Sequence, residues 1–162
     1  MKRDDLYQVA EALEEPMTDF VRESRVRTAL LVNHSGQVLA RHGFSRGFDV
    51  GDVATLAAAA HSSAHALAEL TDSGRWMHLH HAGQEKQIFL APFKVGDQEL
   101  ILVAIFDDDS TLGLVQLFFD RLVESIREVP ELKNRLPEGD VEGFEADLEA
   151  GVERLLSDPE SD

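Results

Sequence analysis

Three stretches of the chain carry apolar residues at spacings of three and four, which is the periodicity of an amphipathic helix. They are residues 6–21, 50–70 and 111–129. Asp49 precedes the second stretch, and Ser110 or Thr111 opens the third, so each offers a side-chain oxygen that can cap a helix. Pro16 lies inside the first stretch and predicts either a kink there or a second helix that begins near it.

Five shorter stretches have the length and apolar content of β-strands. They are residues 26–32, 37–41, 76–81, 87–92 and 98–106. Turn-forming residues at 33–36, 82–83 and 96–97 favour hairpins between neighbouring strands. Residues 100–106 are apolar without alternation, which indicates a central strand buried on both faces. The pattern predicts an α/β fold in the order α-β-β-α-β-β-β-α, with a five-stranded, mainly antiparallel sheet sandwiched by helices.

The same pattern divides the chain into one domain and an appendage. We expect a compact domain over residues 1–129 and a linker over residues 130–139, which is punctuated by proline and glycine. Residues 140–162 form an acidic C-terminal tail with a possible amphipathic helix.

Charge separates this tail from the domain. Residues 131–162 hold 11 acidic and 3 basic side chains, a net charge of −8, against −16 for the whole chain. Phe144, Leu148 and Leu155 recur there at helical spacing, but interior glycines make an isolated helix marginal. The tail is therefore either a solvating appendage or a helix that orders when these three residues contact an apolar groove of a partner.

The charge and the lengths of the apolar runs exclude several classes of function. A net charge of −16 repels nucleic-acid phosphates and anionic lipid heads, so we expect no nucleic-acid binding and no membrane insertion. No apolar run approaches the roughly 20 residues that a membrane-spanning helix needs. The chain has no cysteine and begins with charged residues, so we expect a cytoplasmic protein.

Histidines supply the first candidate chemistry. On the predicted strand His78 and His80 share one face while His81 lies on the other, so only two of them could bind one metal ion. His61 and His65 lie one helical turn apart, but the rest of a zinc-binding pattern is missing. We interpret these side chains as partly buried or interfacial and predict neither a metal nor another cofactor.

Other catalytic patterns are weak. No glycine elbow surrounds residues 62–63 to expose a nucleophilic serine, and no phosphate-binding glycine loop occurs. The carboxylates of residues 107–109 could bind a divalent cation, but beside a helix start they also complement its dipole, which is the interpretation we adopt. No catalytic residue is predicted.

Three segments resemble a known family. Phe106-Asp107, followed by Thr-Leu-Gly-Leu-Val-Gln-Leu at residues 111–117, is similar to the strand-to-helix junction of the bacterial MglB branch of the roadblock (dynein light-chain) family. Asp49 with residues 53–70 resembles the central helix of that branch, and residues 76–83 resemble its third strand. The resemblance covers residues 6–129, and the acidic tail is similar in kind to the extension of MglB proteins.

This resemblance implies a roadblock-type sheet and a homodimer formed through the second helix and third strand. It also implies a non-enzymatic regulator that binds a small Ras-like GTPase of the MglA type, as a GTPase-activating or co-regulatory protein in polarity or motility control. The alternative within the family is a roadblock scaffold without effect on GTP hydrolysis. Activation can use an arginine in trans or hold the GTPase's own groups in place. MglB proteins resemble the case in which the GTPase's own groups are held in place. For an arginine that acts in trans, the candidates are Arg41, Arg46 and Arg75.

The second helix supplies the predicted interface. We expect Leu56, Ala60, Ala64 and Leu67 to face the sheet. A neighbouring stripe of small side chains would then permit close approach of a dimer partner or a GTPase. The interface residues we predict are Thr55, Ala59, Ser62 and Ala66 from this helix and Trp76, His78 and His80 from the third strand. The alternative is an alanine-rich helix chosen only for helix propensity.

Overall fold

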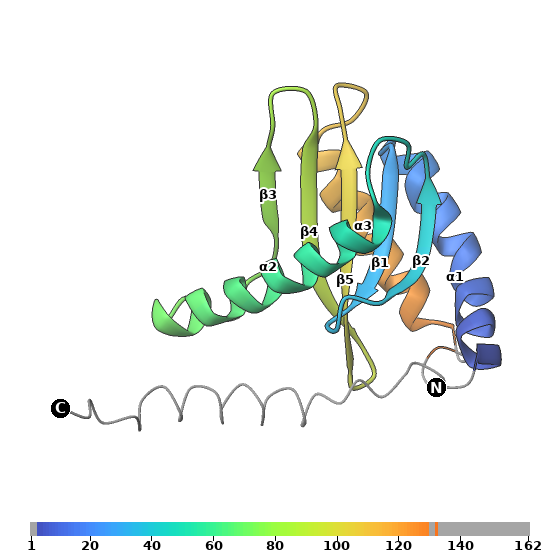
Figure 1. Cartoon of the computed structure of the whole chain (residues 1–162), viewed down its shortest axis with the longest axis horizontal. Coiled ribbons are helices and arrows are strands. Elements are labelled where there is room, and N and C mark those ends of the chain that lie inside the picture. The colour runs from blue at the N-terminus through green and yellow to red at the C-terminus, as the bar shows by residue number, and fades with distance from the viewer. Residues whose placement is uncertain (1–2, 130–131, 133–162) are drawn as a thin grey trace.

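The computed structural model describes residues 3–129 and residue 132 of the 162-residue chain. These residues form a five-stranded antiparallel sheet with helices on both faces (Figure 1). The elements are α1 (Arg3–Ser24), β1 (Thr28–Asn33), β2 (Val38–Gly43), α2 (Val50–Leu70), β3 (Leu79–Ala82), β4 (Gln87–Val95), β5 (Gln98–Phe106) and α3 (Leu112–Arg127). The strand order is β2-β1-β5-β4-β3, which confirms the predicted fold class.

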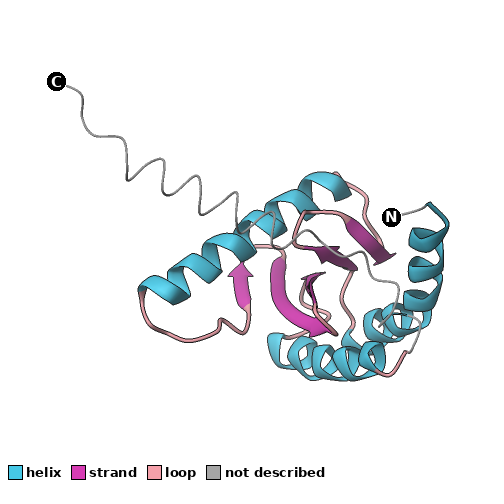
Figure 2. Cartoon of the chain, turned by 90° about the horizontal axis from the view of Figure 1, so that it is seen from below, coloured by secondary structure: helices cyan, strands magenta, loops and turns pink. Residues whose placement is uncertain are grey.

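The sheet separates two hydrophobic cores, and β5 contributes to both. On one face α1 and α3 pack against the sheet, with Leu13 and Ile126 in the same core as Leu102. On the other face lies α2, whose Ala57 shares a core with Ile101 (Figure 2). All side chains of residues 100–106 are buried, so the prediction of a central strand covered on both faces is confirmed.

The bounds of α2 and β5 agree with the prediction, whereas β3 is shorter and β4 is longer. β3 begins at Leu79 because Trp76 packs against the α2-side core instead of pairing with β4. β4 continues through Pro92 to Val95. Pairing with β3 ends at Leu90, so Pro92 has a strand neighbour on one side only, where its missing N–H can be tolerated.

α1 is one helix that continues through Pro16, so the alternative of a second helix beginning there is wrong. A proline inside a helix costs about 3 kcal/mol. Leu13, Met17 and Phe20 flank this proline and are almost fully buried. Burial of each such side chain contributes about 1.5–3 kcal/mol, which together offset the cost.

No helix within residues 3–129 is both long and apolar enough to cross a membrane. The predicted linker and tail lie outside the described residues, apart from Leu132. The Leu132 side chain is buried in the core that α1 and α3 share.

The open end of the first hairpin is tightly packed at Gly43, the last residue of β2, which pairs with Thr28. Gly43 has a φ of 93°, and the next N–H, that of Phe44, donates to the Arg27 carbonyl oxygen at 2.8 Å. A Cβ atom at position 43 would overlap this carbonyl oxygen. At Gly47, where φ is 100°, a Cβ atom would meet open space.

We therefore expect Gly43→Ala to lower the free energy of unfolding more than Gly47→Ala does. Both variants place alanine at a positive φ, which costs about 1–2 kcal/mol, but only Gly43→Ala forces two strands apart, for about 2 kcal/mol more. Urea unfolding at one protein concentration measures the difference. Equal losses would show that the hairpin relaxes around the added methyl group without cost.

Candidate protein interface

β3 is one edge of the sheet and pairs only with β4 in the described chain, so one side of its backbone has no strand neighbour there. All four residues of β3 are exposed. The opposite edge differs, because α1 lies beside β2 and packs against it (Figure 1). An open edge strand presents unpaired N–H and C=O groups to another chain. β3 is therefore the edge at which a second polypeptide can pair.

α2 turns small side chains toward the sheet. Its buried residues are Ala54, Ala57, Ala58, His61, Ala64 and Ala68. Ala60 packs against the α2-side core, as expected, and Ala64 is buried. Leu56 and Leu67 are 68% and 61% exposed, so the expectation that they face the sheet is wrong. A row of alanines lets the helix approach the sheet more closely than leucines would. The face of α2 that carries these alanines is therefore the one that is buried.

The C-terminal part of α2 extends past β3, beyond the edge of the sheet (Figure 1). Leu67 and Leu70 lie on this part and are 61% and 84% exposed. Met77 and Leu79, which precede and begin β3, are also exposed. Single exposed apolar residues are ordinary, but a group of them beside an open strand favours an interface.

The predicted stripe of small side chains lies on the solvent side of α2. Thr55, Ala59 and Ala66 are exposed, and Ser62 is half-buried. The Ser62 hydroxyl donates to the Ala58 carbonyl oxygen at 3.2 Å, so the helix backbone satisfies it. The role of this stripe in binding stays a prediction.

His61 connects α2 to the sheet. Its Nε2 lies 2.7 Å from Oε1 of Glu99, near the start of β5, and its ring packs against Trp76 with 5.3 Å between the ring centroids. Arg75 Nη2 lies 3.8 Å from Oε2 of Glu99. The hydrogen bond from His61 is the main cause that lowers the pKa of Glu99 below its ordinary value. Trp76 therefore contacts α2 through His61 and packs against the α2-side core.

His78 and His80 lie on the face of the sheet that α3 covers. The His78 ring stacks on Phe89 with 5.6 Å between centroids, and the His80 ring stacks on Phe106 with 6.2 Å. His80 Nε2 is also 2.7 Å from Oε1 of Gln87. The two histidines share one face, as the strand alternation predicts.

The histidines considered as metal ligands have other contacts. His61 pairs with Glu99, and His65 Nε2 lies 3.3 Å from Oε1 of Glu69, one helical turn further on. Within the part of the chain that the structure describes, no three His, Asp or Glu side chains gather where they could hold a metal ion.

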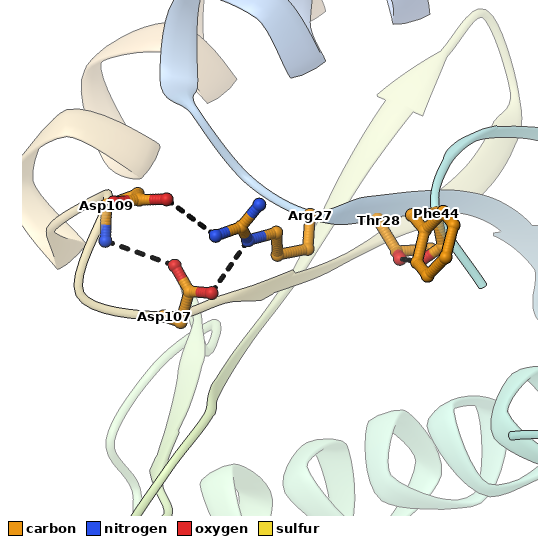
Figure 3. Close-up of polar contacts among 5 residues, drawn as sticks. All are labelled: Arg27, Thr28, Phe44, Asp107 and Asp109. Carbon is orange, nitrogen blue, oxygen red and sulfur yellow. Dashed lines mark hydrogen bonds and ion pairs between the residues drawn. The ribbon is translucent and has the colours of Figure 1, made fainter. Parts of the chain in front are cut away.

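The acidic turn after β5 binds an arginine that directly precedes β1 (Figure 3). Arg27 Nε donates to Oδ2 of Asp107 at 2.7 Å, and Arg27 Nη2 donates to Oδ2 of Asp109 at 2.6 Å. This hydrogen bonding lowers the pKa of Asp107 and raises that of Arg27. Thr111 caps α3, and its hydroxyl accepts the N–H of Leu114. Sequence reasoning missed the Arg27 contacts, because the partners are 80 and 82 positions apart.

The three arginines considered for action in trans do not gather at one place. The Arg46 guanidinium lies over the Phe44 ring at 5.6 Å, in the loop after β2. Arg41 is exposed on β2 itself. Arg75 alone of the three lies in the loop between α2 and β3, with its guanidinium near Glu99 of β5.

Residues 13–106 match the family model of the Roadblock/LC7 domain. The chain belongs to this family, which is one of regulatory domains rather than of classical enzymes. No curated protein matches its sequence.

Solved MglB structures share the fold. The chain is 28% identical to the gliding protein MglB of Thermus thermophilus, with a TM-score of 0.64, over 75% of this chain and 90% of that one. An MglB with a tetrameric arrangement is also 28% identical, with a TM-score of 0.67, over 76% and 91% of the two chains. Myxococcus xanthus MglB is 22% identical, with a TM-score of 0.65, over 72% and 93%, and shows the fold alone.

The link between α2 and β5 predicts a pH-dependent stability. The hydrogen bond with His61 depresses the pKa of Glu99 in the folded chain below its unfolded value of about 4.3. The carboxylate therefore stabilises the fold at neutral pH, and this contribution is lost as the pH falls through the folded pKa. We expect Glu99→Gln to lower the free energy of unfolding at neutral pH, and its deficit against the unmodified chain to shrink in acid.

Urea unfolding over a pH series measures this deficit. Glu85→Gln removes an exposed carboxylate in the turn after β3 and serves as the control, with little effect expected at neutral pH. A Glu99→Gln deficit that is the same in acid and at neutral pH would contradict the assignment.

Proposed function

We propose that the chain acts as a homodimeric regulator of a small Ras-like GTPase of the MglA type. The observation that carries the proposal is the open β3 edge beside the exposed apolar part of α2. Membership of the Roadblock/LC7 family and the 28% identity to two MglB structures support the same function.

Pairing of β3 with its own copy across a two-fold axis would satisfy the open edge and join two sheets into one. Such an interface is isologous, so the same surface of both subunits is covered. The part of α2 that extends past β3, with Leu67 and Leu70, would then lie over the partner's sheet or beside its α2. Trp76, His78 and His80 would approach the partner from the β3 side.

The two copies of α2 would present their small side chains together as the surface for the GTPase. Thr55, Ala59, Ser62 and Ala66 allow a flat partner surface to come close to the helix backbone. Hydrolysis would be accelerated by holding the GTPase's own catalytic groups in place, with Arg75 as the candidate for direct contact. The name of the gliding protein among the relatives supports a process of motility or polarity control.

Leu67→Lys should shift the dimer toward monomer, because it places a charge in the apolar surface that dimerisation covers. Leu117→Lys is the matched control, since Leu117 is 49% exposed but lies on α3. Light scattering at micromolar concentrations should give twice the chain mass for the unmodified chain and the control. A monomeric mass for the unmodified chain would refute the dimer.

GTP turnover by the MglA-type GTPase, with and without this chain, tests the regulatory role. We expect acceleration by about a hundredfold, the scale at which correct positioning of catalytic groups matters. The double variant Ala59→Arg with Ala66→Arg should lose both binding and acceleration, because two long cations prevent close approach to α2. Ser125→Arg, an exposed small residue on α3, should retain both. Binding without acceleration would indicate the scaffold alternative, and an absence of binding would refute the proposal.

A further inference from the structure

Histidine is concentrated at the proposed dimer face. Five of the seven histidines lie on α2 or on the segment that leads into and forms β3: His61, His65, His78, His80 and His81. His80 and His81 make up half of the four-residue strand β3. Any partner that pairs with β3 therefore meets imidazole rings.

The geometry of self-pairing restricts which residues can meet. A two-fold axis that continues an antiparallel sheet stands perpendicular to the sheet, so each residue keeps its face in both copies. Directly opposite residues of an antiparallel pair also share a face. A residue of β3 can therefore lie opposite itself or a residue an even number of positions away, and no other.

This rule places histidine opposite histidine in most registers. If the axis passes through Leu79, His78 lies opposite the partner's His80. If it passes through His80 or His81, that histidine lies opposite its own copy. Of the four residues of β3 through which the axis can pass, only Ala82 gives a register without a histidine opposite a histidine. Opposite residues have Cβ atoms about 4.5–5.5 Å apart, close enough for two imidazolium rings to repel each other.

We propose that self-pairing of β3 makes the dimer proton-sensitive, so that it forms while these imidazoles are neutral and weakens as they become protonated. The proposal rests on the proposed function only in requiring the β3 dimer. Two like charges across the axis disfavour the dimer, so dimerisation releases protons. Affinity is then highest while the imidazoles are neutral and falls as acid protonates them.

The side chains that His78 and His80 contact in the same subunit are uncharged. His80 contacts Gln87 of β4 and Phe106 of β5, and His78 contacts Phe89 of β4. On α3 the Gln116 amide contacts His78, with 3.2 Å between the two Nε2 atoms.

The charged groups on the neighbouring elements either are exposed or contact side chains other than His78, His80 and His81. Glu85 and Lys86, in the turn to β4, are exposed and of opposite sign. At the start of β5 Glu99 pairs with His61, and Arg75 and Lys94 lie near the same carboxylate. Glu69 of α2 lies beside His65. At the end of β5 Asp107 and Asp109 bind Arg27.

The direction of the effect separates it from general acid-induced association. The chain carries a formal charge of −16, so acidification reduces its net charge and by itself favours association. Dissociation on acidification therefore needs a local cause.

Sedimentation velocity of the full chain at constant ionic strength tests the proposal. Between about pH 8 and about pH 5.5 we expect the dimer dissociation constant to rise about tenfold or more. The triple variant His78→Gln, His80→Gln, His81→Gln should dimerise with little dependence on pH. The double variant His34→Gln with His42→Gln, on the β1–β2 hairpin, is the matched control and should keep the dependence of the unmodified chain.

Isothermal calorimetry of dilution gives a second readout that needs no variant. The heat of dissociation, measured in buffers of different ionisation enthalpy near pH 6.5, should report uptake of protons by the monomer. A dimer whose affinity is independent of pH, or that takes up no protons on dissociation, overturns the proposal while leaving the dimer in place. Unchanged pH dependence in a folded triple variant also overturns it. A monomer at every pH refutes the dimer of the proposed function instead.

Discussion

β5 can be buried on both faces only if helices cover both sides of the sheet, and this constraint arranges the rest of the fold. The two layers are unequal. α1 and α3 cover one face with large side chains such as Leu13 and Ile126, while α2 covers the other with alanines. One narrow helix cannot cover five strands. The described part of the chain therefore leaves part of α2 exposed, and Leu67 and Leu70 lie on the end of α2 that passes the edge of the sheet (Figure 1).

The two edges of the sheet differ in what packs beside them. β2 lies beside α1. β2 ends at Gly43, where the backbone comes close to Arg27 and the next N–H donates to the Arg27 carbonyl oxygen. Among the described residues β3 pairs with β4 alone, so its other edge has no strand neighbour, and the strand is four residues long. A short, exposed strand next to an uncovered helix suits pairing with another copy better than it suits an isolated subunit.

Elements with strong periodicity could be predicted from sequence, including α2 and β5 with their bounds. The faces of α2 could not, because alanines on both sides give little contrast, so the pattern wrongly predicts that Leu56 and Leu67 face the sheet. Contacts between distant positions, such as Arg27 with Asp107, follow only from the strand register. The order of the elements along the chain could be predicted, whereas the open β3 edge follows from the strand order of the structure, and the interface residues on it remain predictions.

The alanine-lined face of α2 also affects how the molecule opens. A buried alanine methyl group contributes only about 0.8 kcal/mol, far less than a leucine, so each alanine contact holds α2 to the sheet weakly, and the His61–Glu99 link adds one polar contact to them. Lifting α2 from the sheet should therefore require less free energy than unfolding the β5 core. Amide hydrogen exchange in α2 would then proceed by local opening rather than by global unfolding. A partner bound to α2 would slow this exchange and would stabilise α2 against the sheet.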